Sequence, residues 1–263
     1  MSLVAEERKQ NIVQLLEQHG KVRVSDLANR LHVSTETIRR HLDDLEAENR
    51  LKKVYGGAIK IHQQIEPPHH ERSSIQEKAK HTIGRLAAEQ VSDYDVIYID
   101  EGSTPLPMIP HLISKKQLTI MTTSIPALNM LMEYTKKERL DARVIFIGGE
   151  VNTDHLRTSG PIAEKMLEDF FVTKAFLVAD GIEVKSGITS YDPNKALVTK
   201  KLITHTEETF VLADHTKINH RTYAKMASLE DVTAVICDES APEHFHLPLE
   251  RQQTRWISPA AEE

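Results

Sequence analysis

The chain has 263 residues, of which 40% are hydrophobic and 27% charged, and this fits a globular protein of two domains. A net charge of −6 argues against indiscriminate nucleic-acid binding by the whole molecule. One cysteine, no basic-then-apolar start and no run of about eighteen apolar residues exclude an internal disulfide, a secretion signal and a membrane span, so we expect a cytoplasmic protein.

The charge is unevenly distributed along the chain. Residues 1–60 hold 11 Lys and Arg against 9 Asp and Glu, whereas the remaining residues hold 22 against 30. A basic end on an acidic body favours a local DNA contact and a different task for the body. We therefore expect a DNA-binding domain over 1–60, a linker over 61–75 and a larger domain over 76–263.

Two helical patterns occupy the start of the chain. Ile12, Leu15 and Leu16 share one face of a helix expected over residues 5–18. After a short β-branched stretch, Ser25 is placed to cap a second helix. The spacing of these patterns predicts a helix-turn-helix motif at about residues 20–39.

A third helix is predicted to begin after Ser34, which can cap it, and its apolar stripe consists of Ile38, Leu42 and Leu45. At 100° per residue, Glu36 and Arg40 then point outward. A helix that begins with hydroxyl residues and presents arginines suits the major groove of DNA. Glu36 has two possible roles, accepting a hydrogen bond from a cytosine or pairing with Arg40.

The sequence RLKKVYGGAIK, residues 50–60, predicts a strand, a Gly-Gly turn and a second strand. Such a hairpin beside a helix-turn-helix is a wing, expected at 51–60, whose lysines meet DNA phosphates. The residues predicted to contact DNA are Lys21, Ser25, Ser34, Thr35, Glu36, Thr37, Arg39, Arg40, Lys52, Lys53, Gly56, Gly57 and Lys60.

From residue 76 the pattern changes to apolar runs that alternate with helical segments. This alternation predicts an α/β domain with a mostly parallel sheet covered on both faces. The runs are VIYID, LTIMTT, RVIFIGG, KAFLVAD, TFVLAD and TAVICD. Ligands of such sheets bind beyond the carboxyl ends of the strands, so the polar residues that close each strand are the candidates for a site.

These strand ends carry hydroxyls, glycines, carboxylates and one lysine. A Gly turn followed by hydroxyls at a helix start can hold a phosphate, and carboxylates can accept hydrogen bonds from sugar hydroxyls. We therefore predict a site for a small phosphorylated polyol. Its residues are Asp100, Gly102, Ser103, Thr104, Thr123, Ser124, Asp180, Gly181, Asp214 and Lys217.

No metal site or cofactor is predicted. His69 and His70 are adjacent, which makes sharing one ion difficult, and His244 and His246 offer no better spacing. We interpret these histidines as solvated and expect Cys237 to pack inertly in a buried strand.

The segment VSDLANRLHVSTETIRRHLDDLEAENRLKKVYGGA, residues 24–58, resembles the N-terminal domain of DeoR-family bacterial transcription regulators. That family carries V-S-x-x-T-I-R-R in its recognition helix and G-G-A in its wing. His41 departs from the family pattern, which usually has an acidic residue there. By the rotation above, His41 lies at the edge of the buried stripe.

The resemblance extends to the large domain, because DeoR-type regulators carry a sugar-phosphate sensor domain similar to ribose phosphate isomerases. The matching segments are Asp100–Thr104, Thr123–Ser124, Ala179–Ile182 with Gly187 and Thr189, and Asp214 with Lys217, and Arg72 and Lys78 match at the domain's entry. The departures are Glu101 for a small residue, Thr123 for Asn and Lys195 for Glu.

The resemblance implies a repressor of a carbohydrate operon that binds operator DNA and is released by a phosphorylated sugar. One recognition helix reads few base pairs, so we expect a homodimer or homotetramer. An isomerase-like enzyme with a DNA-binding module is the alternative, with Asp180 or Glu183 as base and Lys200 or Lys201 as cation. A third possibility is an architectural DNA binder with a vestigial second domain.

Overall fold

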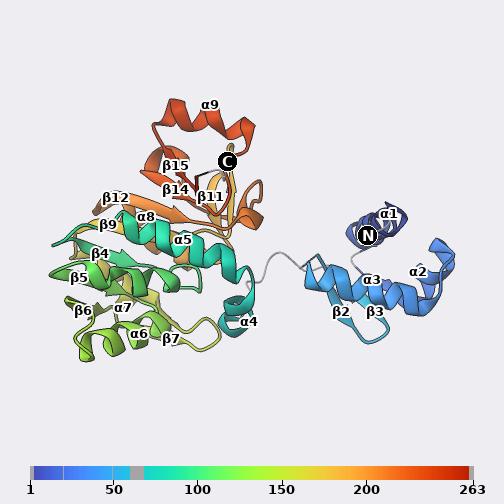
Figure 1. Cartoon of the computed structure of the whole chain (residues 1–263), viewed down its shortest axis with the longest axis horizontal. Coiled ribbons are helices and arrows are strands. Elements are labelled where there is room, and N and C mark those ends of the chain that lie inside the picture. Colours follow the sequence, from blue (N-terminus) through green and yellow to red (C-terminus); the bar gives the residue numbers. More distant parts are fainter. Residues whose placement is uncertain (1–2, 20, 49, 60–67, 261–263) are drawn as a thin grey trace. The chain divides into compact units, whose positions relative to one another are not determined.

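The computed structural model describes residues 3–19, 21–48, 50–59 and 68–260. The chain divides into two compact units, Met1–Gln63 and Gln64–Glu263. Figure 1 labels their helices and strands. We describe each unit by itself.

Unit 1 packs three helices against a small antiparallel sheet with the strand order β1-β3-β2. Its core holds the apolar residues that the sequence patterns placed inward, namely Ile12, Leu15, Leu16, Leu27, Ile38, Leu42 and Leu45. The elements are α1 (Leu3–His19), β1 (Lys21–Arg23), α2 (Val24–Leu31), α3 (Thr35–Ala47), β2 (Lys52–Val54) and β3 (Gly57–Ile59).

The caps of α2 and α3 differ. Ser34 caps α3 as predicted, because the Thr37 N–H donates to Ser34 Oγ at 3.2 Å. The prediction that Ser25 caps α2 was wrong. That helix begins at Val24, with Arg23 as an N-cap that forms no side-chain hydrogen bond. Val24 is buried in the core, so the helix starts one residue before Ser25.

The wing needs both of its glycines. Gly56 lies in the two-residue turn with φ +78°, a conformation that side chains disfavour. Gly57 starts β3, which pairs with β1, and a Cβ at this position would lie 2.0 Å from the carbonyl oxygen of Val22. The close approach of two backbones therefore excludes any larger residue at position 57.

Unit 2 is built on a seven-stranded parallel sheet with the order β15-β14-β12-β9-β4-β5-β6. The six predicted apolar runs all form strands of this sheet. The seventh strand, β15, was not predicted because it is short and polar at its start. The strands are β4 (Val96–Ile99), β5 (Leu118–Thr122), β6 (Ala142–Phe146), β9 (Val172–Val178), β12 (Thr206–Leu212), β14 (Ala234–Ile236) and β15 (Arg255–Ile257).

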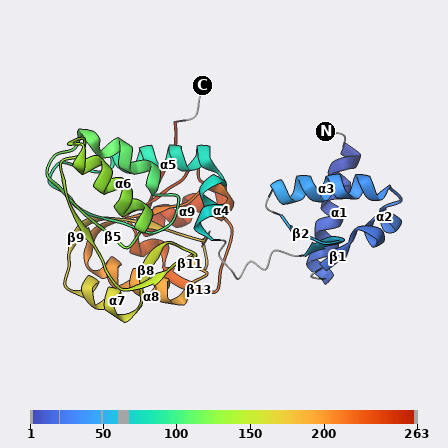
Figure 2. The ribbon, with the colours of Figure 1, turned by 90° about the horizontal axis from the view of Figure 1, so that it is seen from below.

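Helical segments cover both faces of the sheet (Figure 2). Alternate side chains of β4 show the two faces: Ile97 and Ile99 pack in one cluster and Tyr98 in the other. The first face is covered by α5 (Glu77–Glu89), η1 (Leu106–Ser114) and α6 (Ile125–Lys136), the second by α7 (Gly160–Glu168) and α8 (Pro193–Thr204). The helix α9 (Glu243–Gln252) packs through Phe245 and Leu249 on a third cluster.

Smaller strands extend from the carboxyl edge of this sheet. One hairpin consists of β7 (Glu150–Asn152) and β8 (Arg157–Ser159), which pair antiparallel. A second small sheet contains β10 (Gly181–Glu183), β11 (Gly187–Ser190) and β13 (Ala224–Ala227). Single 3₁₀ turns complete the unit at η2 (His215–Lys217) and η3 (Leu229–Asp231).

The predicted linker is partly folded. Helix α4 (His69–Ser74) belongs to unit 2, and the N–H of His69 donates to the carbonyl of Asp154 at 2.8 Å. His69 is buried, so its interpretation as solvated was wrong, because α4 packs against the loop between β7 and β8. Lys60 and residues 61–67 lie outside the described residues. Across the described ranges, no helix is both long and apolar enough to cross a bilayer.

Candidate functional site

The outer face of α3 carries the charged residues that the sequence assigned to DNA. Glu36, Arg39 and Arg40 are all exposed. Arg39 Nη1 lies 3.5 Å from Glu36 Oε2, so Glu36 pairs with Arg39 and not with Arg40. Within the described part of the chain Arg40 forms no ion pair, and its guanidinium is available to an external partner. Thr37 is turned toward Ser34, with its hydroxyl 2.9 Å from Ser34 Oγ.

The wing is fastened to α3 through one of its lysines. Lys53 Nζ pairs with Asp43, and the N–H of Lys53 donates to Glu46 Oε1 at 2.7 Å. The hydrogen bond to Asp43 raises the pKa of Lys53. Lys52 stays exposed on the same strand, and Tyr55 at the turn is fully exposed. Lys52 is therefore better placed than Lys53 to reach a phosphate.

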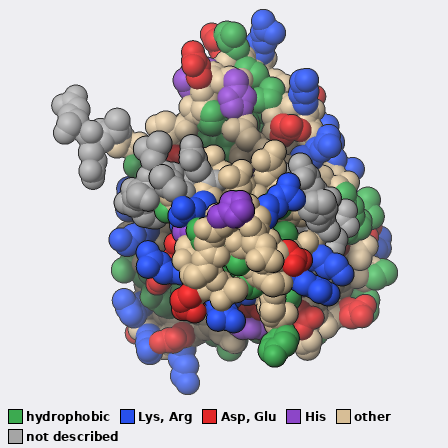
Figure 3. Space-filling view, turned by 90° about the vertical axis from the view of Figure 1, so that its right-hand side faces the viewer, with side chains coloured by type: hydrophobic (Ala, Val, Ile, Leu, Met, Phe, Trp, Pro, Cys, Tyr) green, Lys and Arg blue, Asp and Glu red, His purple; other side chains and the backbone are tan. Residues whose placement is uncertain are grey.

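A hollow of about 510 Å³ lies beside the wing in unit 1. Leu15 and Leu27 contribute apolar lining, and the predicted contact residue Lys21 lines it together with Arg23 and Arg30. Ser25 and Thr35 are exposed, as a contact with DNA requires. On the face in Figure 3, Lys and Arg side chains are interspersed with Asp and Glu. Residues 1–60 hold 11 Lys and Arg against 9 Asp and Glu, so the basic excess of unit 1 is small.

Two of the described polar residues of unit 1 are buried: Lys9, which the sequence analysis missed, and His41, which it placed at the edge of the buried stripe. Lys9 of α1 is almost fully buried, with Nζ 3.1 Å from Asp44 Oδ2 and 3.0 Å from Glu48 Oε1. The hydrogen bond to Glu48 raises its pKa, and the pairing ties α1 to α3. His41 is also buried, and burial lowers its pKa.

In unit 2 the loop after β4 forms the centre of the predicted effector site. Asp100 Oδ2 accepts the N–H of Val178 at 2.9 Å, which joins this loop to β9. Gly102 has φ +109°, and Ser103 Oγ donates to the carbonyl of Arg72 in α4 at 3.3 Å. Thr104 is buried beside it. The loop is therefore shaped by contacts with both the sheet and α4.

Other predicted site residues already have structural partners. Ser124 caps α6 by accepting the N–H of Ala127 at 3.2 Å, and Thr123 Oγ1 lies 3.1 Å from the Tyr98 hydroxyl. Both are buried. The Thr123 hydroxyl thus faces the second face of the sheet, and Ser124 has a helix-capping role.

The two later carboxylates shape turns. Asp180 Oδ2 accepts from Ser190 Oγ at 2.8 Å and from the N–H of Tyr191 at 3.1 Å. Asp214 caps η2 by accepting the N–H of Thr216 at 3.0 Å, and the Thr216 hydroxyl donates to it as well. Gly181 is needed for packing, because a Cβ there would lie 2.5 Å from the carbonyl oxygen of His220.

Lys80 lies within range of two other cations, Arg72 and Lys217, and of two carboxylates, Asp214 and Glu77. Lys80 of α5 is buried and donates from Nζ to the Arg72 carbonyl. Burial lowers the pKa of Lys80 to about 8, with Arg72 and Lys217 acting in the same direction and Asp214 and Glu77 opposing them. The sequence analysis missed Lys80 because it lies inside a helix, away from any strand end. Lys217 was predicted from its place after a strand, and Arg72 was found through the family pattern.

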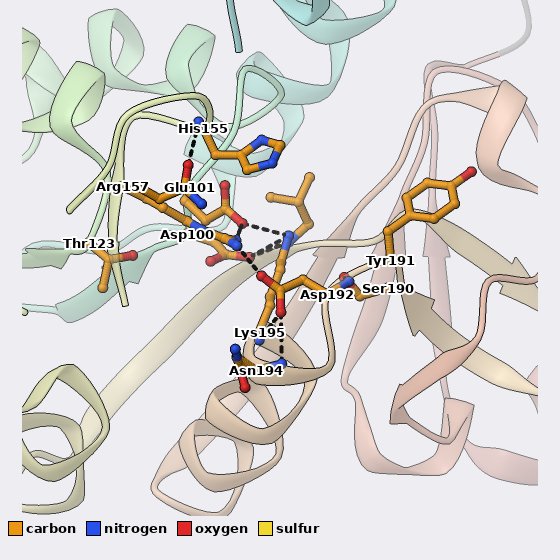
Figure 4. Close-up of polar contacts among 12 residues, drawn as sticks. Asp100, Glu101, Thr123, His155, Arg157, Ser190, Tyr191, Asp192, Asn194 and Lys195 are labelled. Atoms are coloured by element: carbon orange, nitrogen blue, oxygen red, sulfur yellow. Dashed lines mark hydrogen bonds and ion pairs between the residues drawn. The ribbon is translucent and has the colours of Figure 1, made fainter. Parts of the chain in front are cut away.

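A second charged cluster surrounds Glu101 (Figure 4). Arg157 of β8 pairs with Glu101 and with Asp192, the residue before α8. Lys195 Nζ lies 3.2 Å from Glu101 Oε1 and 3.7 Å from Asp100 Oδ2. The loop after β4, the hairpin β7–β8 and the start of α8 are therefore joined by ion pairs. Arg157 and Asp192 were missed, since no motif marks either residue.

The two acidic residues of this cluster respond differently to their surroundings. Burial by itself acts to raise the pKa of both Asp100 and Glu101, but the nearby charges change the outcome for each. For Glu101, the combined effect of Lys195, Arg157 and Arg72 outweighs burial and lowers the pKa to about 2. For Asp100, burial and the charge of Glu101 prevail over Lys195, and the pKa is raised. Glu101 is therefore the ionised partner of the two cations.

Little open space remains in this region. The cavity lined by Glu101, Arg157, Lys195 and Asn194 has a volume of about 30 Å³, roughly the volume of one water molecule. Sites for small molecules are typically about ten times larger or more. A sugar phosphate would therefore have to separate some of these side chains.

One group of potential metal ligands occurs in the described residues of unit 2. His215 Nδ1 lies 2.7 Å from Asp238 Oδ2 and 3.7 Å from Glu239 Oε1. The same Asp238 accepts the N–H of His215 at 2.8 Å, and Glu239 is exposed. These contacts fasten η2 to the end of β14, which is a structural role.

Comparison with known proteins identifies the family. The model of the DeoR-like helix-turn-helix domain matches residues 8–64, and that of the DeoR C terminal sensor domain matches residues 75–239. The chain belongs to the DeoR family. It is a DNA-binding transcriptional regulator with an N-terminal helix-turn-helix unit and a C-terminal sensor unit.

Two relatives span most of this DeoR-family chain. The uncharacterized HTH-type transcriptional regulator YulB of Bacillus subtilis (strain 168) is 34% identical over 237 residues, 90% of each chain. The glycerol-3-phosphate regulon repressor of Escherichia coli (strain K12) is 29% identical over 239 residues, 90% of this chain and 92% of that one. A solved ribose 5 phosphate isomerase A from Neisseria gonorrhoeae matches with TM-score 0.40 and 19% identity, over 57% of this chain and 56% of that one.

Two departures from the DeoR-family pattern contact each other. Glu101 and Lys195 replace a small residue and a glutamate, and they form the buried ion pair described above. The acidic residue of this pair thus lies at position 101, and position 195, where the family pattern has a glutamate, carries its cationic partner. The third departure is Thr123, whose hydroxyl forms a hydrogen bond with the hydroxyl of Tyr98.

Proposed function

We propose that this regulator represses an operon for the use of a carbohydrate and that a phosphorylated sugar or polyol releases it from DNA. The observation that carries this proposal is the group of cations Lys80, Arg72 and Lys217, of which Arg72 contacts the hydroxyl-bearing loop 102–104 through its carbonyl. These three cations outnumber the two carboxylates of the group, Asp214 and Glu77, so the surroundings of Lys80 favour an anion. The name of the E. coli relative, a glycerol-3-phosphate regulon repressor, supports a phosphorylated effector.

In the proposal, α3 and the wing of unit 1 bind the operator. Arg40 reads a base in the major groove, and Lys52 and Lys21 contact phosphates. A single α3 reads only a few base pairs, so the regulator acts as a homodimer or homotetramer on repeated half-sites. It works in the cytoplasm, where bacterial DNA lies.

Helix α4 is the element that couples effector to DNA in this proposal. It follows residues 60–67 in the chain and contacts the effector loop, since Ser103 Oγ donates to the Arg72 carbonyl. The same helix is held to the β7–β8 loop by the bond from His69 to Asp154. An effector that moves the loop also shifts α4, and the population of DNA-competent arrangements changes with it.

Catalysis is not part of the proposal. Asp180, a candidate base, is held by Ser190 and Tyr191, and Glu183 Oε2 accepts from Ser186 Oγ. Both carboxylates thus have structural partners, whereas isomerisation needs a base free to reach a sugar carbon. Incubation with ribose 5-phosphate tests this point. Turnover that disappears in Asp180→Asn would show an enzyme.

The proposal is tested by a screen of sugar and polyol phosphates for compounds that release operator DNA from the full chain. Fluorescence anisotropy of the labelled DNA measures the release. At least one compound should release the DNA. Ser103→Ala and Lys217→Ala should bind operator as the wild type does but require at least about tenfold more effector, because each removes a ligand of the phosphate. Glu208→Ala, on the opposite edge of the sheet, is the matched control. Loss of DNA binding in a folded Ser103→Ala protein would contradict this division of labour.

A further inference from the structure

Glu101 lies where an external anion would be expected. It precedes Gly102 in the effector loop and is almost fully buried, as are Arg157 and Lys195. Its Oε1 accepts from Arg157 Nη1 and lies 3.2 Å from Lys195 Nζ. Among the described residues, Oε2 has no hydrogen-bond partner. A carboxylate on the chain itself thus holds two buried cations and keeps one oxygen unused (Figure 4).

The charges of this cluster are already matched. Arg157 and Lys195 pair with Glu101, Asp192 and Asp100, and Arg72 also acts on Glu101, so three acidic groups match three basic ones. Around Lys80, in contrast, the three cations Arg72, Lys80 and Lys217 outnumber the two carboxylates Asp214 and Glu77. An incoming anion is therefore favoured near Arg72, Lys80 and Lys217, here called the Lys80 side, and disfavoured near Arg157 and Lys195, here called the Arg157 side.

We propose that Glu101 is a built-in anion that occupies the Arg157–Lys195 pair and keeps external anions out of it. An effector consequently meets the Arg157 side with uncharged groups such as hydroxyls, while its phosphate binds on the Lys80 side. The placement of the effector's phosphate and hydroxyls rests on the proposed function. The exclusion of external anions by Glu101 is independent of it.

The physical reason is competition with a tethered group. A carboxylate fixed on the same loop has a high effective concentration at the two cations, and a free anion must displace it. Removal of the carboxylate leaves Arg157 with Asp192 and Lys195 with Asp100 at 3.7 Å, whose raised pKa makes it a weak anionic partner, so the buried cations are poorly compensated. An added anion of suitable size then restores the pairing.

The test uses the full chain, with inorganic phosphate as probe at constant ionic strength and isothermal titration calorimetry as the measurement. Glu101→Ala should bind phosphate at least about tenfold more tightly than the wild type, because a competing charge within about 3 Å is removed. Phosphate should also raise the melting temperature of Glu101→Ala more than that of the wild type. Glu101→Gln, which keeps the shape of the side chain, should show the same gain on a smaller scale.

Two controls identify the place where phosphate binds. Glu208→Ala removes a half-exposed carboxylate at the opposite edge of the sheet and should leave phosphate binding unchanged. Adding Arg157→Ala to Glu101→Ala should abolish the gain, since the anion is held by Arg157. If Glu101 has only a structural role, Glu101→Ala should have a lower melting temperature than the wild type, and phosphate should not restore it.

The proposal is wrong if neither Glu101 variant gains phosphate affinity or thermal rescue. A Glu101→Ala chain that stays unfolded in phosphate, together with a Glu101→Gln chain that binds like the wild type, also overturns it. Failure of the proposed function looks different. In that case the variants gain phosphate binding, yet no sugar phosphate releases operator DNA from the wild type.

Discussion

His41 lies in the core of unit 1, and neither of its ring nitrogens has a hydrogen-bond partner among the described residues. Burial lowers its pKa, Lys9, Arg8 and Arg40 lower it further, and Asp44 opposes them. The imidazole is therefore kept neutral in the folded unit. A charged imidazole at this place would be buried without a partner, which is costly.

This residue predicts a loss of stability in acid. The unfolded chain binds the proton at a pKa of about 6.5, above the folded value, so the free energy of unfolding of unit 1 is constant at higher pH and decreases as the pH falls below about 6.5. The decrease continues down to the folded pKa and amounts to about 1.4 kcal/mol per unit of pKa difference. NMR titration of the His41 ring protons, with urea unfolding followed by amide signals of α3, measures both quantities.

His41→Leu is the control, because leucine fills a similar volume without titrating. It should remove the acid-dependent part of the unfolding free energy of unit 1 and leave the value at pH 8 similar or higher. A ring pKa at or above 6.5 in the folded chain would contradict this account.

At the site, residue types at strand ends could be predicted, but their pairing could not. Ser103, Asp214 and Lys217 stand out because hydroxyls and charges close strands in a parallel sheet. Arg157 and Asp192 are invisible to such reasoning, since they reach Glu101 through a hairpin and a helix cap distant in sequence. Lys80 could not be predicted from the sequence either, because its burial depends on how α5 packs against the rest of unit 2.

Helix α3 and the wing act as one element. The bonds from Lys53 to Asp43 and Glu46 hold the hairpin against the helix, and Gly57 lets the hairpin approach β1. The lysine closest to the helix thus serves to orient the wing. Lys52 and Arg40 are exposed cations of this element that form no ion pair among the described residues.

From this arrangement we expect Arg40→Ala to lower operator affinity by about 1–3 kcal/mol, with little change for a random duplex, because one base contact is lost. Lys52→Ala should instead weaken both duplexes and reduce the slope of log affinity against log salt by about one. Fluorescence anisotropy at several salt concentrations separates the two effects. An Arg40→Ala protein with unchanged operator affinity would remove Arg40 from the interface.

Most elements followed from hydrophobic periodicity. The six apolar runs became strands because a strand buried on both faces is apolar throughout. The exceptions have physical reasons. Strand β15 has a charged start at the sheet edge, and α4 is too short and polar for any periodicity. Its helical state depends on packing against the β7–β8 loop.

The whole molecule combines a DNA-binding unit with a sensor unit, and its specificity depends on how many DNA-binding units act together. We expect the full chain to bind an operator of two half-sites, selected from random duplexes, with a steep dependence on their spacing. Inserting 5 base pairs turns one half-site by about half a turn and should lower the affinity at least about tenfold, whereas 10 base pairs should restore part of it.

Gel-shift titration, with sedimentation to count chains per duplex, measures this dependence. A single half-site of equal length is the control and should bind weakly. Equal affinity for the original spacing and for the insertions of 5 and 10 base pairs, with one chain per duplex, would show that the regulator binds DNA as a monomer.

Cys237 is the sole thiol of the chain and is buried directly after β14. Burial raises its pKa to about 12, so almost no thiolate is present near neutrality, and the thiolate is the form that reacts with maleimides. Cysteines introduced at exposed Tyr55 and Tyr223 can therefore carry fluorophores without background labelling. Energy transfer between the two dyes then follows the separation of the units while effector is added.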